Sequence, residues 1–213
     1  MTIRFPLADL AEQVEAFAAR WPDARADANG VCFAAAGGEA RLRVPLAGPR
    51  VRPAERVGDY VARLPGPVEQ QAVLLLRAGA MAIGWWRGDE LLHHKAQRRY
   101  VVRGHGKAQP LHGKTRGRSR YGARLRMQNW KRLLGETNER LRAWWRELGA
   151  ADRVFHAVPV RAFSDLLAAD PPPPFARGDA ALQRVPMHVH RPDFEELLRV
   201  RGWLCHGRLE LPG

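Results

Sequence analysis

The sequence has only two cysteines and no long hydrophobic run, and each scarcity excludes a class of protein. Cys32 and Cys205 are far apart and lack any C-x-x-C or Cys/His spacing, so neither a disulfide framework nor a structural zinc site is predicted. No apolar stretch approaches the roughly 20 residues that a membrane span requires. The opening residues 1–6 lack the apolar region of a secretory signal. We therefore expect a protein of the reducing cytoplasm with no membrane partner.

Acidic residues are almost absent between Lys95 and Arg146. That window holds 16 of the chain's 35 Lys and Arg residues, whereas its only acids are Glu136 and Glu139, so it carries about +14. The other 161 residues hold 19 basic and 20 acidic side chains and sum to about −1. The net charge of +13 is thus concentrated in one stretch, where Gly and His are interspersed among the cations. This pattern indicates a surface that binds a polyanion.

The first 66 residues predict a small α+β region. Apolar residues three or four apart between Leu7 and Phe17 indicate a helix that ends at Trp21-Pro22. Two strand-like runs, 31–36 and 40–45, meet at Gly37-Gly38 as in a hairpin. A further helix is predicted around 53–63. Pro65-Gly66-Pro67 is typical of a linker, so residues 1–66 are expected to form an N-terminal extension and residues 67–213 a second domain.

Residues 67–213 alternate between strand and helix patterns after an initial antiparallel meander. The elements expected in chain order are strands at 73–77, 80–86 and 91–102, a glycine-rich loop at 104–118, a long helix at 119–148, a strand at 154–159, a helix at 161–168, a strand at 183–189 and a helix at 192–201. This order predicts an α/β domain with a mixed sheet of about five strands and flanking helices.

One short motif lies in the centre of the basic stretch. Gly106-Lys107-Ala108-Gln109 has the form G-x-x-Q, which as a bare pattern carries little information. Its context raises its value, because it follows a predicted strand, precedes a long helix and lies among glycines that allow a close backbone approach to a ligand. The alternative is a flexible, solvated loop without a partner. So much positive charge in one loop repels itself unless an anion is bound, which favours the ligand-binding interpretation.

The residues around this motif resemble a known family. The run Arg99-Tyr-Val-Val-Arg-Gly-His-Gly-Lys-Ala-Gln109, with Lys114-Thr-Arg-Gly-Arg-Ser-Arg-Tyr-Gly-Ala-Arg-Leu-Arg-Met-Gln-Asn129, is similar to the Vms-like release-factor domain. That family includes a eukaryotic ribosome quality-control peptidyl-tRNA hydrolase and shorter bacterial relatives. Its fold is similar to the catalytic middle domain of eukaryotic and archaeal class 1 release factors. The resemblance is sharpest over 95–130 and extends by strand order to about 68–210; residues 1–66 show no such resemblance.

The resemblance implies hydrolysis of the ester between a nascent peptide and the 3′ end of tRNA. Gln109 matches the family's glutamine, and Gly106 is implied to shape the loop. A glutamine amide does not titrate near neutral pH, so it is expected to position water, while its backbone N–H donates to the developing oxyanion. The ribosome and the tRNA 2′-OH are implied to supply the remaining groups, without a cofactor or metal. Ala108 departs from the Gly-Gly-Gln of release factors and restricts the backbone beside Gln109.

The cations of the same stretch are expected to bind phosphates of ribosomal RNA and of the tRNA acceptor stem. The predicted RNA-binding residues are Lys107, Lys114, Arg116, Arg118, Arg120, Arg124 and Arg126. For any single arginine the alternative is a solvated helix face. The partners implied are the large ribosomal subunit and peptidyl-tRNA, and no DNA is expected.

Two other functions stay open. One is a ribosome- or RNA-binding protein that uses the loop for docking without catalysis. The other is cleavage of tRNA near its 3′ CCA end, an activity proposed for some family members. A metal-dependent nuclease needs clustered carboxylates, and between Gln71 and His105 the only acids are Asp89 and Glu90, both in a predicted turn.

Two histidine pairs and two tryptophan pairs are further candidates for binding sites. His93-His94 and His188/His190 lack nearby Cys or carboxylate partners, so a surface or packed role is favoured over metal binding. In Trp85-Trp86 and in Trp144-Trp145, one ring is expected in the core and the other near the surface, where base stacking is a less favoured alternative.

Overall fold

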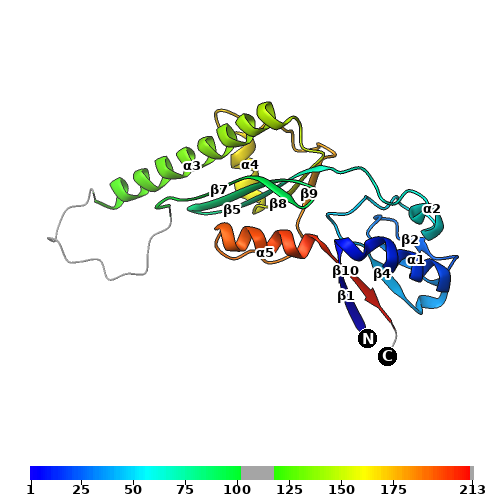
Figure 1. Ribbon diagram of the computed structural model, residues 1–213. Coiled ribbons are helices and arrows are strands. Elements are labelled where there is room, and N and C mark those ends of the chain that lie inside the picture. Colours follow the sequence, from blue (N-terminus) through cyan, green and yellow to red (C-terminus); the bar gives the residue numbers. More distant parts are fainter. Residues whose placement is uncertain (102–117, 212–213) are drawn as a thin grey trace. The chain divides into compact units, whose positions relative to one another are not determined.

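The computed structural model describes residues 1–101 and 118–211, which form two compact units (Figure 1). The first unit comprises Met1–Val68 together with Arg199–Gly213, and the second comprises Glu69–Leu198. Each unit has its own hydrophobic core and its own five-stranded sheet. The predicted mixed α/β class is confirmed.

The first unit is an antiparallel sheet with two helices. Its elements are β1 (Thr2–Pro6), η1 (Leu7–Asp9), α1 (Leu10–Arg20), β2 (Arg25–Ala26), β3 (Cys32–Ala34), η2 (Ala36–Gly38), β4 (Arg41–Arg43), α2 (Val57–Val61) and β10 (His206–Glu210), with strand order β1-β10-β4-β3-β2. The predicted hairpin at Gly37-Gly38 is present between β3 and β4. The core gathers Phe17, Phe33 and Tyr60.

The pairing of the chain's two ends differs from the expected division at residue 66. We expected residues 67–213 to form one domain, but β10 pairs with both β1 and β4. Phe5 lies opposite Gly207, and a Cβ at Gly207 would lie 2.2 Å from the Phe5 ring, so the glycine makes room for that ring. Neither β1 nor β10 was predicted, because their pairing joins segments about 200 residues apart.

The second unit is a mixed sheet. Its elements are β5 (Gln70–Arg77), β6 (Ala80–Arg87), β7 (Glu90–Arg98), α3 (Arg118–Leu148), β8 (Arg153–Ala157), α4 (Val160–Leu167), β9 (Leu182–Arg184) and the first residues of α5 (Phe194–Leu204). The strand order is β7-β6-β5-β8-β9, with β7, β6 and β5 antiparallel and β8 and β9 parallel to β5. The predicted meander is confirmed, and α3 lies in the connection between β7 and β8.

Helices cover both faces of this sheet (Figure 1). On one face, Leu133, Leu141 and Trp144 of α3, with Phe163 of α4, pack on the core residues of β5, β6 and β8. On the other face, a Cβ at Gly84 would lie 3.0 Å from Leu197 of α5, so the glycine allows close contact. The central strands read as nearly continuous apolar runs because both of their faces are buried.

Two of the boundaries that differ from those expected have a local reason. The strand expected at 183–189 ends at Arg184, because Pro186 has no N–H for a strand ladder. The last helix begins at Phe194 and not at Pro192: Asp193 Oδ1 accepts a hydrogen bond of 2.9 Å from the Glu196 N–H, which is an N-cap contact. Trp86 was expected near the surface if Trp85 was in the core, yet only 3% of it is exposed. That prediction is wrong, because α5 covers the second face.

Candidate functional site

Most of the predicted catalytic and RNA-binding residues lie outside the described part of the chain. Those residues are Gly106, Lys107, Gln109, Lys114 and Arg116. Arg118 and Arg120 lie in the first turn of α3. Arg124 is exposed and Arg126 is half-buried further along the same helix, beside the exposed Leu125 and Met127. Neither arginine pairs with a carboxylate of the described residues.

The structure shows how the chain on both sides of residues 102–117 is held. Arg99 follows β7 and donates two hydrogen bonds to the Glu136 carboxylate in α3, one from Nε at 3.1 Å and a shorter one from Nη2. Gln97 adds a third bond, from Nε2 to Glu136 Oε2 at 2.5 Å. Asn129 Nδ2 donates to the Tyr100 carbonyl oxygen at 2.8 Å. The residues that end and follow β7 are therefore joined to α3 at two positions, Asn129 and Glu136.

Glu136 is one of only two acids in the basic stretch of the sequence, and its carboxylate is bound by side chains of the second unit. The hydrogen bonds from Arg99 and Gln97, with the nearby Arg132 charge, hold the pKa of the Glu136 carboxyl below its usual range. Sequence reasoning gave Glu136 no role. The signal that could have found it is its isolation: a lone acid among many cations is expected to have a specific partner.

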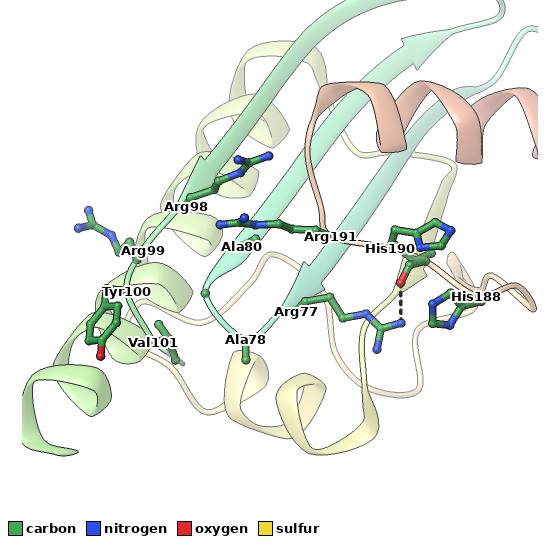
Figure 2. Close-up of a pocket in the computed structure, with 12 residues that line it drawn as sticks. Arg77, Ala78, Ala80, Arg98, Arg99, Tyr100, Val101, His188, His190 and Arg191 are labelled. Carbon is green, nitrogen blue, oxygen red and sulfur yellow. Dashed lines mark hydrogen bonds between the residues drawn. The ribbon is translucent and has the colours of Figure 1, made fainter. Parts of the chain in front are cut away.

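An open cavity of about 740 Å³ lies next to this junction, at one end of the sheet (Figure 2). It is bounded by the β5–β6 turn at 77–80, the residues that end β7 and follow it at 98–101, and the segment 188–191. Its side chains include Arg77, Arg98, Arg99, Arg191 and two histidines, and no Asp or Glu is among the described residues that line it. Sequence reasoning missed Arg77 and Arg191, because they lie outside the basic stretch and reach the cavity only through the fold.

The histidine pairs have packing partners and no metal-ligand geometry. His93 stacks on Trp144, with ring centroids 5.4 Å apart, and its Nε2 lies 3.0 Å from Glu147 Oε1. His94 lies against Phe194, and the rings of His188 and His190 meet edge to face at 5.1 Å. Within residues 1–101 and 118–211, no group of three or more His, Cys, Asp or Glu side chains is arranged to hold a metal ion.

The acids that a metal-dependent nuclease would need are at the wrong end of the sheet. Asp89 and Glu90 are exposed in the β6–β7 turn. Glu90 begins β7 and Arg98 ends it, so the two ends are separated by roughly 27 Å of extended strand. In the described part of the second unit, no carboxylate cluster approaches the chain on either side of residues 102–117.

A model of the family described as the Bacteroidetes VLRF1 release factor matches residues 71–210, well over half of the chain. The chain belongs to this family. The residues that match the VLRF1 model extend from β5 to β10 and include the whole of the G-x-x-Q motif. The resemblance to Vms-like release factors is thereby confirmed.

Curated relatives of this VLRF1 chain are named tRNA endonuclease ANKZF1. The bovine protein is 36% identical over 133 residues, which is 60% of this chain and 18% of the relative. The mouse protein is 33% identical over 160 residues, or 72% of this chain and 21% of the relative, and the human protein is 34% identical over 132 residues. The chain thus spans about a fifth of the length of these relatives.

A solved structure shows the same fold at low sequence identity. The protein described as the Vms1 mitochondrial localization core superposes with a TM-score of 0.53 and 14% identity, covering 97% of this chain and 82% of that one.

Through residues 1–101 and 118–211, no helix combines the length and apolar character that crossing a bilayer requires.

Proposed function

We propose that this VLRF1 family member is a peptidyl-tRNA hydrolase that acts on ribosome-bound peptidyl-tRNA in the cytoplasm. The observation that carries the proposal is that the release-factor family match includes Gly106 to Gln109, within a stretch of about +14. The charge fits an RNA-rich surrounding, since phosphate contacts supply most of the sequence-independent affinity for RNA.

In the proposed reaction, water attacks the ester carbonyl carbon that joins the peptide to the 3′-terminal ribose. The bond from that carbon to the ribose oxygen breaks, the peptide leaves as a carboxylic acid, and tRNA keeps its hydroxyl. The neutral amide of Gln109 orients the water, and its backbone N–H stabilises the oxyanion. Gly106 gives the loop its backbone freedom. The ribosome supplies the cavity in which this geometry is held.

The cations have a separate role in the proposal. Lys107, Lys114, Arg116, Arg118 and Arg120 bind phosphates of the large-subunit RNA and of the tRNA. Arg124 and Arg126 continue this surface along α3, where their lack of carboxylate partners among the described residues leaves their charge available. Phosphate contacts of this kind weaken steeply as salt increases.

Cleavage of tRNA near its 3′ end is the second candidate function. The observation that favours it is the name of the mammalian relatives, tRNA endonuclease, at 33–36% identity. The two reactions break different bonds: the carbonyl ester in one, and a phosphodiester in the other. They therefore give different tRNA products from one substrate.

The experiment is a release assay on isolated large subunits that carry peptidyl-tRNA, with products resolved by mass. We expect free peptide and tRNA of full length. The Gln109→Ala variant should bind subunits normally and release peptide at least about tenfold more slowly, equivalent to about 1.4 kcal/mol of transition-state stabilisation. Gln13→Ala, a matched change on α1 in the first unit, should release peptide like the wild type. Equal rates of peptide release for Gln109→Ala and wild type would reject the hydrolase proposal and favour a non-catalytic RNA-binding protein. A tRNA product that lacks its CCA end would instead identify a nuclease.

A second assay tests the cations. Reversing the charge at Arg116 and Arg118 should weaken subunit binding and flatten its dependence on salt between about 50 and 200 mM, because fewer counterions are released on binding. Unchanged binding at both salt concentrations would contradict an RNA-facing role for these two residues.

A further inference from the structure

We propose that the cavity bounded by residues 77–80, 98–101 and 188–191 is a phosphate-binding subsite for single-stranded RNA. The inference rests on the proposed function and adds a site outside the predicted set of cations. The described residues that line it all belong to the second unit.

The charge of the cavity is the first argument. Among the residues that the structure describes, four guanidinium groups line it and no carboxylate does. Arg98 pairs with Asp193 at 3.1 Å and Arg99 pairs with Glu136, so two of the four charges have internal partners. Among residues 1–101 and 118–211, Arg77 and Arg191 form no ion pair with a carboxylate. The cavity therefore keeps a positive charge that an anion is needed to balance.

The positions of its walls are the second argument. Arg77 donates from Nη2 to the carbonyl oxygen of the buried Val189 at 2.8 Å, which ties β5 to the 188–191 segment (Figure 2). Gly79, at φ +84°, accepts a 2.8 Å hydrogen bond from the Arg99 N–H, and a Cβ there would lie 2.7 Å from the Arg99 carbonyl oxygen. The three segments are therefore held together before any ligand binds, which lowers the ordering cost of binding.

Guanidinium chemistry selects the ligand class. Its planar array of N–H donors matches the oxygens of a phosphate, and arginine is more weakly hydrated than lysine, so it binds phosphate with less desolvation cost. Arg191 is exposed and Arg77 is half-buried, so a ligand can reach both from solvent. Figure 2 shows the Arg191 side chain extending from the 188–191 segment toward the β6 end of the cavity.

The surroundings favour an RNA strand over a small anion. Tyr100 lines the same cavity with 53% of its surface exposed, and a base can stack on its ring while the adjoining phosphate contacts the arginines. The cavity also includes Val101, the residue after which the chain leads to Gly106 and Gln109. An RNA end held there contacts Val101, which precedes the segment with the proposed catalytic residue in the chain.

The test measures binding of a fluorescent single-stranded RNA ending in CCA to the full chain by anisotropy, at several salt concentrations. Arg191→Glu should weaken binding at least about tenfold and reduce the slope of log K against log salt by about 0.7, the value for losing one phosphate contact to a single strand. Arg87→Glu is the matched control, because Arg87 is exposed at the opposite end of β6. It should change binding less than threefold.

Three outcomes would overturn the inference. Equal losses for Arg191→Glu and Arg87→Glu would mean that only overall charge matters. No loss for Arg191→Glu and for Arg77→Gln would mean that RNA does not reach the cavity. Inorganic phosphate that competes as well as an RNA of equal phosphate concentration would indicate a small-anion site.

Failure of the inference can be told from failure of the proposed function. Gln109→Ala should keep wild-type RNA affinity in the anisotropy assay. If that variant releases peptide normally while Arg191→Glu still loses RNA binding, the hydrolase proposal fails and the subsite stands. If Arg191→Glu binds RNA like the wild type while Gln109→Ala loses activity, the reverse holds. A thermal melt of each variant confirms that the fold is retained.

Discussion

Arg99 and Glu136 form a two-point ion pair that joins the residue after β7 to the middle of α3. Both side chains are only partly exposed, at 24% and 33%. Arg99 precedes residues 102–117, which include Gln109, by three positions in the chain, and it also contributes to the cationic cavity. This ion pair therefore links α3 to the cationic cavity and to the strand end that precedes the G-x-x-Q motif.

Replacing Glu136 by Gln should loosen this junction. The variant keeps the size and one acceptor but loses the charge, and partial exposure limits the cost to about 1 kcal/mol in the free energy of unfolding. Because the Glu136 pKa is lowered in the fold, its contribution is complete above the unfolded value of about 4.3 and is lost as pH falls through the folded value. Urea unfolding at pH 7 and below pH 4 should therefore show a difference between variant and wild type that shrinks in acid. Glu139→Gln, at an exposed site on α3, is the control.

Local sequence patterns predicted the parts of the fold that depend on near neighbours. The apolar runs of β5 and β6 and the helical stripe through Leu133 and Leu141 were recovered, because periodicity reports burial directly. Leu125 has the same helical spacing as Leu133 and Leu141, yet it is 37% exposed. Periodicity shows which face is apolar and does not show where the neighbouring sheet ends.

Features built from distant segments were not predictable in this way. The pairing of β1 with β10 leaves only a weak alternation in residues 2–5, where Phe5 is buried and Ile3 is exposed. The cavity draws on three segments, and Arg77 and Arg191 meet only after the sheet has formed. The G-x-x-Q motif, in contrast, was found because its residues are adjacent in the chain, as local motifs are.

Glu69 should be required for the stability of the second unit. Its carboxylate pairs with Arg153, whose side chain is 2% exposed and lies over the Phe155 ring at 5.3 Å. Glu69→Ala leaves a buried guanidinium without its carboxylate, which costs about 3 kcal/mol once the partial exposure of Glu69 is allowed for. Chemical denaturation followed by tryptophan fluorescence measures the loss. Glu90→Ala, in an exposed turn, should change the unfolding free energy by less than about 0.5 kcal/mol.

Gly84 should tolerate no side chain. A Cβ at this position would lie 2.3 and 2.4 Å from two ring carbons of Trp86 and 3.0 Å from Leu197. Gly84→Ala should therefore force the indole or the α5 contact to shift and destabilise the unit by about 1–3 kcal/mol. In the control Gly178→Ala, the new methyl group meets no atom within 4 Å. The midpoint of chemical unfolding measures this loss. Equal midpoints for Gly84→Ala and Gly178→Ala would show that the Trp86 ring moves without a cost in stability.

His156 should make the stability of the second unit depend on pH below about 6.5. Its ring stacks on Phe163 at 4.6 Å, and its buried Nδ1 has no hydrogen-bond partner among the described residues. Burial, with a smaller effect from the Arg184 charge, lowers the pKa of the imidazole below the usual 6.5.

The unfolded chain therefore binds a proton at this site more readily than the folded one, and stability falls as pH drops from 6.5 toward the folded pKa. His156→Phe removes the site, so the difference in unfolding free energy between wild type and variant should change across this window and be constant above pH 7. His206→Phe, at an exposed position in the first unit, is the matched control. A difference between wild type and His156→Phe that stays constant from pH 5 to 8 would show that the imidazole gains a proton as easily in the fold as in the unfolded chain.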